Sequence, residues 1–96
     1  MGIVIESFAC KKTKRLFEKG SASGFLEAIK KQAARKLSML HFAARLDDLR
    51  MAPGNRLESL KGKRKGQWSI RINDKYRICF RFENGNACEV EITDYH

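Results

Sequence analysis

The C-terminal residues Asp94, Tyr95 and His96 are the side chains of this sequence best suited to acid–base chemistry. The imidazole of His titrates near neutral pH, so His96 can accept or donate a proton, and its own terminal carboxylate favours the protonated ring. A terminal histidine is more often frayed and idle, so this candidate needs support from elsewhere in the chain. His41, the other histidine, falls on the flank of a predicted helix and is interpreted as structural or solvent-facing.

Positive charge is concentrated in the residues that precede this acidic end. Between Arg56 and Arg81 there are nine Lys or Arg residues and only two acids, Glu58 and Asp74, a balance of +7. Residues 82–96 carry four acids and neither Lys nor Arg. This pattern predicts a basic loop and a basic sheet face, edged by an acidic strand and facing an anionic partner. The candidate anion-binding side chains are Arg56, Lys61, Lys63, Arg64, Lys65, Arg71, Arg77 and Arg81.

These two features together could cleave RNA without a metal ion. The 2′-hydroxyl of RNA can attack the adjacent phosphate if a base removes its proton, an acid protonates the leaving 5′-oxygen, and cations stabilise the charge at phosphorus. The arginines of the sheet face, the lysines of the loop before it, and Tyr95 with His96 at the C-terminal end could together supply the base, the acid and the cations. The acids are scattered, and no Cys/His cluster has zinc spacing, so neither a metal site nor a cofactor is predicted.

The first half of the chain, up to the turn-like sequence around Pro53, reads as helical. A short strand is predicted over residues 3–8 and a helix over residues 10–19, ending at Gly20. Ser23 is a plausible cap for a second helix, whose apolar positions recur at helical spacing. That stripe is Leu26, Ile29, Ala33, Leu37, Leu40 and Ala44, and the basic residues Lys30, Lys31, Arg35 and Lys36 fall outside it.

The second half reads as antiparallel strands over residues 68–73, 76–82 and 88–92, because apolar and polar residues alternate. Three-residue loops at 73–75 and 84–86 place all apolar residues on one side, pairing Trp68 with Phe80 and Phe82 with Cys88. Tyr76 then closes the hairpin end of the core. The opposite face collects Ser69, Arg71, Arg77, Cys79, Arg81, Glu89, Glu91 and Thr93, with Arg71 and Arg77 side by side as like charges.

The 96 residues and the net charge of +9 predict one small basic domain spanning residues 1–96. Three widely spaced cysteines do not form a disulfide framework, which is typical of a reducing compartment. No apolar stretch is long enough to span a bilayer, and the N-terminus lacks the features of a secretory signal. These observations together predict a cytoplasmic protein that does not contact the membrane.

Four segments resemble the HigB-type toxins of the RelE/ParE superfamily of bacterial toxin–antitoxin systems. They are the N-terminal stretch of residues 5–8 and 11–20, residues 56–70 with their Leu-Lys-Gly-x-Arg-Lys-Gly block, residues 73–82, and the ending Asp94-Tyr95-His96. The resemblance implies a compact α+β RelE-like fold, with an antiparallel sheet and N-terminal helices packed on one face. It also implies an mRNA endoribonuclease that in many members acts on the ribosome, and a HigA-like antitoxin with a helix-turn-helix domain.

By position in this resemblance, Arg77 would bind the scissile phosphate and Lys61 would help bind RNA or balance charge. Asp94, Tyr95 and His96 would shape the acid–base end, with Tyr95 or His96 as the proton carrier. Glu58 departs from the family pattern, because members often carry His there. A carboxylate at this position could act as a base, orient a neighbour, or weaken RNA binding.

Two other functions remain compatible with the sequence. A gyrase poison, as in ParE relatives, would not need the basic sheet face or the Asp-Tyr-His end, and would break DNA while leaving message intact. A non-enzymatic binder of RNA or ribosomes would keep its binding without His96, and that binding would fall steeply with salt.

Overall fold

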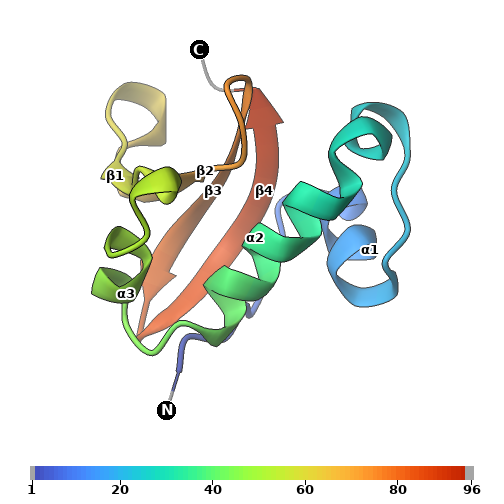
Figure 1. The fold of residues 1–96 in the computed structure, drawn as a ribbon. Coiled ribbons are helices and arrows are strands. Elements are labelled where there is room, and N and C mark those ends of the chain that lie inside the picture. Colours follow the sequence, from blue (N-terminus) through green and yellow to red (C-terminus); the bar gives the residue numbers. More distant parts are fainter. Residues whose placement is uncertain (1, 95–96) are drawn as a thin grey trace.

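A computed structural model describes residues 2–94 (Figure 1). The helical elements are α1 (Lys11–Lys19), a 3₁₀ segment (Gly24–Ile29), α2 (Lys30–Phe42), α3 (Leu46–Arg50) and two 3₁₀ turns (Pro53–Asn55 and Gly62–Arg64). The strands are β1 (Glu58–Ser59), β2 (Gln67–Arg71), β3 (Tyr76–Glu83) and β4 (Asn86–Asp94). The predicted α+β class, with helices first and an antiparallel sheet second, is confirmed.

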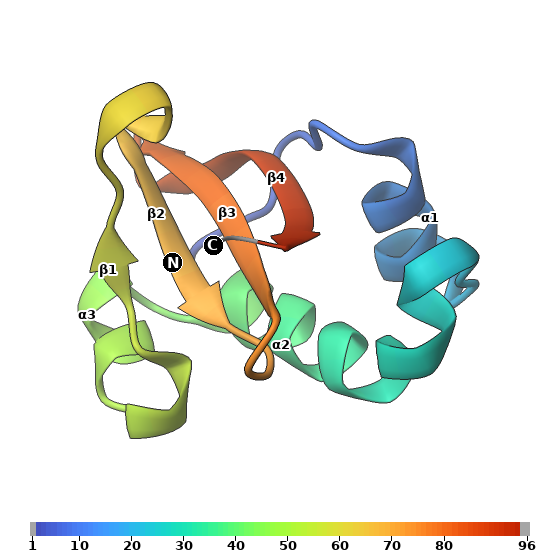
Figure 2. The ribbon, with the colours of Figure 1, turned by 90° about the horizontal axis from the view of Figure 1, so that it is seen from above.

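The four strands form one antiparallel sheet in the order β1-β2-β3-β4. Helix α2 lies across one face of this sheet, α1 lies beyond the β4 edge, and α3 lies beside β1 (Figures 1 and 2). We call the opposite side, which α2 leaves uncovered, the outer face. Within residues 2–94, no helix is long and apolar enough to cross a membrane.

The apolar stripe of the first half is confirmed, with one change in the form of the helix. Leu26 and Ile29 are buried in the 3₁₀ segment, and the regular helix α2 begins only at Lys30. Ser23 precedes that segment, but its side chain makes no capping hydrogen bond. Gly20 ends α1 in the left-handed conformation, with φ 70°, as its position predicted.

Two residues of the predicted second helix differ from the prediction. Ala44, the last residue of the stripe, lies after the end of the helix and is exposed. Lys36, expected outside the stripe, is 92% buried because its amine reaches a buried amide oxygen of Asn55. Periodicity alone misplaced Lys36, since its partner lies in a loop that is distant in sequence.

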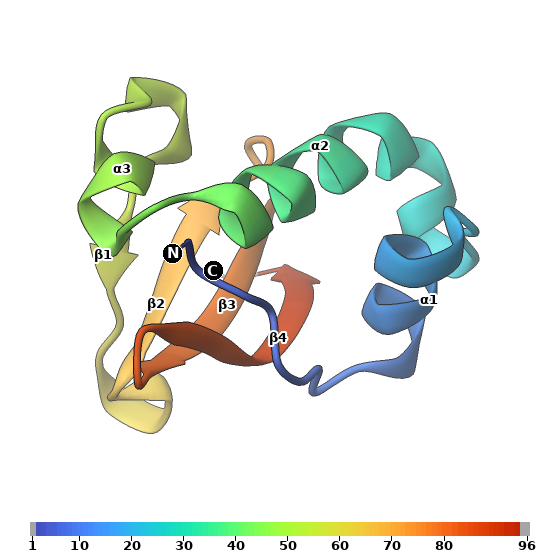
Figure 3. The ribbon, with the colours of Figure 1, turned by 90° about the horizontal axis from the view of Figure 1, so that it is seen from below.

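The strand predicted over residues 3–8 is present only as two isolated bridges, Ile5 with Ala87 and Phe8 with Val90. This segment runs parallel to β4 along its free edge (Figure 3). Between the bridges, Glu89 has a φ of 51°, and its N–H donates to the side-chain oxygen of Ser7 at 2.9 Å. The ladder is interrupted there, because a backbone with positive φ cannot continue regular pairing.

The first hairpin has the predicted register, with Trp68 opposite Phe80 and Arg71 opposite Arg77. The second hairpin differs, because its turn has two residues, Asn84 and Gly85, both with positive φ. Ala87, not Cys88, therefore faces Phe82.

A register shift in β4, where Glu89 has positive φ, compensates for the shorter turn. Beyond this bulge Ile78 faces Ile92, which is the register that the three-residue loop predicted. Alternation therefore predicted correctly which side chains share a face beyond the bulge. The predicted length of the turn was wrong, because a two-residue turn and a bulge together produce the same register there.

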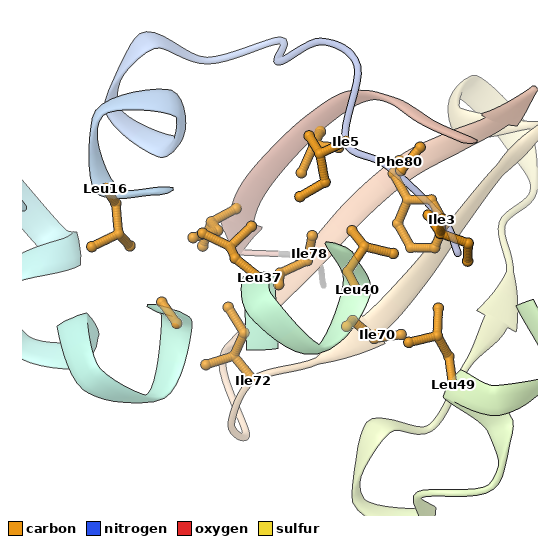
Figure 4. Close-up of a cluster of buried hydrophobic side chains, with 14 of the residues drawn as sticks. Ile3, Ile5, Leu16, Leu37, Leu40, Leu49, Ile70, Ile72, Ile78 and Phe80 are labelled. Atoms are coloured by element: carbon orange, nitrogen blue, oxygen red, sulfur yellow. The ribbon is translucent and has the colours of Figure 1, made fainter. Parts of the chain in front are cut away.

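The core lies between α2 and the sheet (Figure 4). Phe80, Ile78 and Ile70 of the sheet pack in one cluster with Leu37 and Leu40 of α2, and all five are fully buried. Each such side chain contributes roughly 1.5–3 kcal/mol through removal of its surface from water. This packing fixes the position of β2 and β3 against α2, and the outward-pointing residues of the two strands form much of the site described next.

Candidate functional site

Arg77 lies at the centre of the outer face, in β3, opposite Arg71 of β2 and Thr93 of β4. Its side chain is only 12% exposed. Nε donates to the hydroxyl oxygen of Ser69 at 2.7 Å, and Nη2 donates to the carbonyl oxygen of Arg56 at 2.6 Å. These bonds hold the guanidinium plane in one orientation, with its charge at the surface of the sheet.

The carboxylate of Glu58 completes this arrangement, with Oε1 at 3.3 Å from Nη2 of Arg77. Glu58 is opposite Ser69 in the β1–β2 ladder, so alternation places it on the same face as Arg77. Its side chain is 54% exposed, so the carboxylate faces solvent as well as the guanidinium. The site therefore combines an oriented cation with an accessible carboxylate.

The chain approaches this site through a loop with an unusual backbone. Arg56 follows the 3₁₀ turn Pro53–Asn55 and has a φ of 44°, in the left-handed region that non-glycine residues seldom adopt. The carbonyl of Arg56 accepts the hydrogen bond from Arg77. Sequence reasoning missed both this carbonyl and the Ser69 hydroxyl, although alternation had placed Ser69 on the correct face.

The other arginines of the outer face each have a carboxylate partner. Arg64 pairs with Glu91 at 3.0 Å, Arg81 pairs with Glu89 at 2.9 Å, and Arg71 pairs with Asp74. With the pair of Arg77 and Glu58, four cations and four anions balance. The predicted repulsion between Arg71 and Arg77 is therefore relieved by Asp74 and Glu58. The acidic strand β4 supplies the partners of the other two arginines, Glu91 for Arg64 and Glu89 for Arg81.

Three further lysines of this region lie in the loop between β1 and β2. Lys61, Lys63 and Lys65 are exposed and take part in none of the ion pairs found among residues 2–94. Arg56 is also exposed. The predicted basic sheet face is thus corrected, because its arginines are paired with carboxylates. The exposed lysines of the predicted basic loop, together with Arg56, form a cationic rim beside the sheet.

The outer face is also less open than alternation predicted. Ser69 and Cys79 on this face are fully buried. Burial raises the pKa of the Cys79 thiol, and the Glu91 carboxylate opposes ionisation further while the Arg64 and Arg77 guanidinium groups favour it. Cys79 therefore acts as a small packed side chain beneath the charged groups, as free cysteines commonly do.

Of the predicted acid–base residues, the structure describes only Asp94. Asp94 is the last residue of β4 and is opposite Tyr76, next to the pair of Arg77 and Thr93. Tyr95 and His96 lie outside the described residues, so their predicted roles remain predictions. Tyr76 stacks on Phe25 at 4.9 Å between ring centroids and packs on the core, which confirms that it closes this end of the core.

The other candidates have structural roles. His41 accepts a hydrogen bond at Nδ1 from the Ile5 amide at 3.2 Å and packs against Phe17 at 5.1 Å, which confirms the structural interpretation. The three cysteines are free. Among residues 2–94, no group of three His, Cys, Asp or Glu side chains could hold a metal ion.

Cys88 should react slowly with iodoacetamide at pH 8. Desolvation and a contact with the Glu6 carboxylate, 3.4 Å from Sγ, raise the pKa of Cys88 to about 11, so little thiolate is present at pH 8. Glu6→Gln removes the negative charge, lowers this pKa, and should speed alkylation several-fold. Mass spectrometry of modified peptides gives the rate, with Cys10 as the internal control, and equal rates at Cys88 in both proteins would contradict this assignment.

Comparisons with known proteins agree with the fold. Residues 6–96 match the family described as "RelE-like toxin of type II toxin-antitoxin system HigB". The endoribonuclease HigB of Proteus vulgaris is 37% identical over 93 residues, which cover 97% of this chain and 100% of that protein. Toxin HigB-1 of Vibrio cholerae is 49% identical over 53 residues, covering 55% of this chain and 56% of the toxin.

Two solved structures share this fold at low sequence identity. The YoeB-YefM complex from Staphylococcus aureus gives a TM-score of 0.58 at 16% identity, covering 100% of this chain and 99% of the matched chain. The YoeB/ParE toxin from Agrobacterium tumefaciens gives 0.56 at 17% identity, and both chains are covered completely. The family match over nearly the whole sequence and the full-length relative lead to one conclusion: this chain belongs to the HigB family of RelE-like toxins of type II toxin–antitoxin systems.

Proposed function

We propose that this chain is an endoribonuclease that cleaves mRNA by attack of a 2′-hydroxyl on the adjacent phosphate. The observation that carries this proposal is the oriented Arg77 guanidinium with the Glu58 carboxylate 3.3 Å away. A cation stabilises negative charge at phosphorus, and a carboxylate beside it can take the proton of a nucleophilic hydroxyl. The full-length relative from Proteus vulgaris is named an endoribonuclease, which supports this assignment.

In this proposal Arg77 binds the scissile phosphate and Glu58 is the general base. The 2′-oxygen forms a bond to phosphorus as its proton passes to Glu58, and the bond from phosphorus to the 5′-oxygen breaks. The end of β4 supplies the acid that protonates the leaving 5′-oxygen, through Tyr95 or His96, with Asp94 shaping that end. The register supports this placement, because Thr93 is directly opposite Arg77 and the chain continues from there.

In this proposal the cationic rim beside the sheet binds the RNA backbone. Its residues are Lys61, Lys63, Lys65 and Arg56, which are exposed and take part in none of the ion pairs of the described part of the chain, so they can attract phosphates directly. Arg64, Arg71 and Arg81 bind RNA only by exchanging a carboxylate for a phosphate. Exposed ion pairs stabilise a protein by about 0–1 kcal/mol. Replacing Asp74 by a phosphate at Arg71 therefore costs little free energy, because the Asp74 side chain is 99% exposed.

The proposed setting is the bacterial cytoplasm, with message bound to the ribosome as substrate and translation as the process inhibited. The proposed protein partner is a HigA-like antitoxin with a helix-turn-helix domain. Structures that share this fold include toxin–antitoxin complexes, YoeB-YefM of Staphylococcus aureus and RelBE2 of Mycobacterium tuberculosis, which supports a partner of this class. No cofactor is needed for the proposed step, because RNA carries its own nucleophile.

The test is to express the chain in bacteria and map the 5′ ends of cellular RNA, then repeat the cleavage with purified protein and translating ribosomes. New 5′-hydroxyl ends, with 2′,3′-cyclic phosphates on the upstream fragments, are expected. DNA breaks with intact message would favour a gyrase poison instead. Binding to ribosomes without any cleavage would favour a non-enzymatic binder.

Deleting His96, or replacing Tyr95 with Phe, identifies the proton carrier. The change at the true carrier should lower the cleavage rate by about 10²–10⁴-fold, the usual contribution of general acid–base catalysis. RNA binding should persist in both variants, because the cationic rim is untouched. Lys19→Ala, an exposed cation at the end of α1, is the matched control. Full activity in both variants would remove the β4 end from the mechanism.

A further inference from the structure

The segment formed by residues 55–58 carries two of the groups that touch Arg77. The Arg56 carbonyl accepts from Nη2 at 2.6 Å, and the Glu58 carboxylate lies 3.3 Å from the same atom. On its C-terminal side this segment is held by the β1–β2 ladder, which β1 enters with only two residues. Such a short strand fixes the segment weakly, so its N-terminal side needs a second attachment.

Asn55 provides that attachment, with a side chain that is completely buried. Its Oδ1 accepts a hydrogen bond from the Lys36 amine at 2.5 Å, and its Nδ2 donates to the Leu49 carbonyl at 3.0 Å. Lys36 belongs to α2 and Leu49 to α3. One amide side chain therefore joins two helices to the residue that directly precedes Arg56.

Burying the Lys36 amine beside Asn55 has a cost in free energy of folding. Lys36 is 8% exposed, and it forms none of the ion pairs found among residues 2–94. Burial lowers the pKa of its amine, and the guanidinium groups of Arg35 and Arg71 lower that pKa further. An amine buried against a neutral oxygen stabilises a fold less than an apolar side chain of the same size. Stability alone would favour Met or Leu here, beside the buried Leu37 and Leu40.

We propose that Lys36 and Asn55 are positioning residues of the active site, which fix the Arg56 carbonyl and Glu58 so that Arg77 points at the scissile phosphate. This inference rests on the proposed function only for its effect on cleavage, because the effect on Arg77 itself can be measured without RNA. The hydrogen bond from Lys36 to Asn55 links α2, on the covered face of the sheet, to the loop that reaches the outer face.

The test compares Lys36→Met with Lys31→Met, a change at an exposed lysine of the same helix. Lys36→Met should lower the single-turnover cleavage rate by about tenfold to a hundredfold, since small displacements of catalytic groups have effects of that size. RNA affinity should change much less, because the cationic rim is intact. In nuclear magnetic resonance spectra, the Nε–H of Arg77 should exchange faster with water, as its bond to Ser69 loosens. Lys31→Met should change none of these quantities.

A second variant separates positioning from folding. Replacing both Lys36 with Met and Asn55 with Leu removes both partners of the bond between them, which proteins tolerate better than the loss of one. It leaves the Leu49 carbonyl without its former donor, whereas Lys36→Met leaves the buried Asn55 oxygen without one. This double variant should be at least as stable in urea as Lys36→Met and still show fast exchange at Arg77. Slow, wild-type exchange at Arg77 in either folded variant would overturn the inference. If the wild-type chain cut no RNA, the proposed function would fail, while the Arg77 exchange would still decide the positioning role.

Discussion

Replacing Arg77 with Ala should lower the rate of RNA cleavage by about 10²–10³-fold, the usual effect of removing one charge-stabilising group from a transition state. Arg77 is held by Ser69, Arg56 and Glu58, so its guanidinium needs no reorganisation when negative charge develops at phosphorus. Arg77→Lys should recover only a small part of the rate, because an ammonium group cannot reproduce the planar fork that meets three partners at once. Single-turnover assays with ribosome-bound message measure the effect.

The control for Arg77 is a guanidinium whose removal leaves the site unchanged. Arg15 of α1 is exposed and lies in an element beyond the β4 edge, so Arg15→Ala should retain wild-type cleavage (Figure 2). Circular dichroism and urea denaturation establish that the Arg77 variants are folded, since the loss of a partner for Ser69 has a cost of its own. A folded Arg77→Ala protein that cleaves RNA at the wild-type rate would disprove the site.

Glu58→Gln should tighten RNA binding and slow RNA cleavage. The glutamine keeps the size of the side chain and removes its charge, so a phosphate meets less repulsion at Arg77 and RNA binding should tighten. The same change removes the proposed general base, so the cleavage rate should fall by about 10²–10⁴-fold. Equilibrium binding to a 2′-deoxy substrate, which cannot be cleaved, and single-turnover cleavage of the matching RNA measure the two effects separately.

Asp74→Asn is the matched control for Glu58, because Asp74 is also the carboxylate partner of an outer-face arginine, Arg71. It should tighten RNA binding slightly and leave the cleavage rate unchanged. If Glu58→Gln instead behaves like Asp74→Asn, with tighter binding and full activity, Glu58 acts only as a competitor of the phosphate. In that case the base must come from another residue.

The net charge of +9 has a different physical meaning in the fold than it has in the sequence. Alternation placed the arginines of β2 and β3 on one face correctly, and the acidic composition of β4 was plain from the sequence. What the sequence could not show is that Glu89 and Glu91 fold back onto Arg81 and Arg64. Counting charges along the sequence therefore located the charged face but did not reveal that its arginines are paired with carboxylates.

The local patterns in the sequence were sufficient to predict the α+β class, the buried stripe of the helices and the register of the first hairpin. The reason is that helical and strand periodicities depend on neighbouring residues only. The register of the second hairpin depended on the bulge at Glu89, whose backbone is fixed by contacts with Ser7 far away in the chain. Contacts between residues so far apart in the chain produce no periodic pattern in the sequence, so they could not be predicted from it.

The candidate site divides in the same way. The types of its residues, with Arg77 as the central cation and Glu58 as an unusual carboxylate, could be taken from the sequence and its resemblance to a family. Only the tertiary structure decided that these two meet, that Ser69 and the Arg56 carbonyl orient the guanidinium, and that a buried lysine of α2 anchors the loop. Each of these contacts joins residues at least eight positions apart. They form because hydrophobic burial between α2 and the sheet brings these segments together, an effect that no local spacing records.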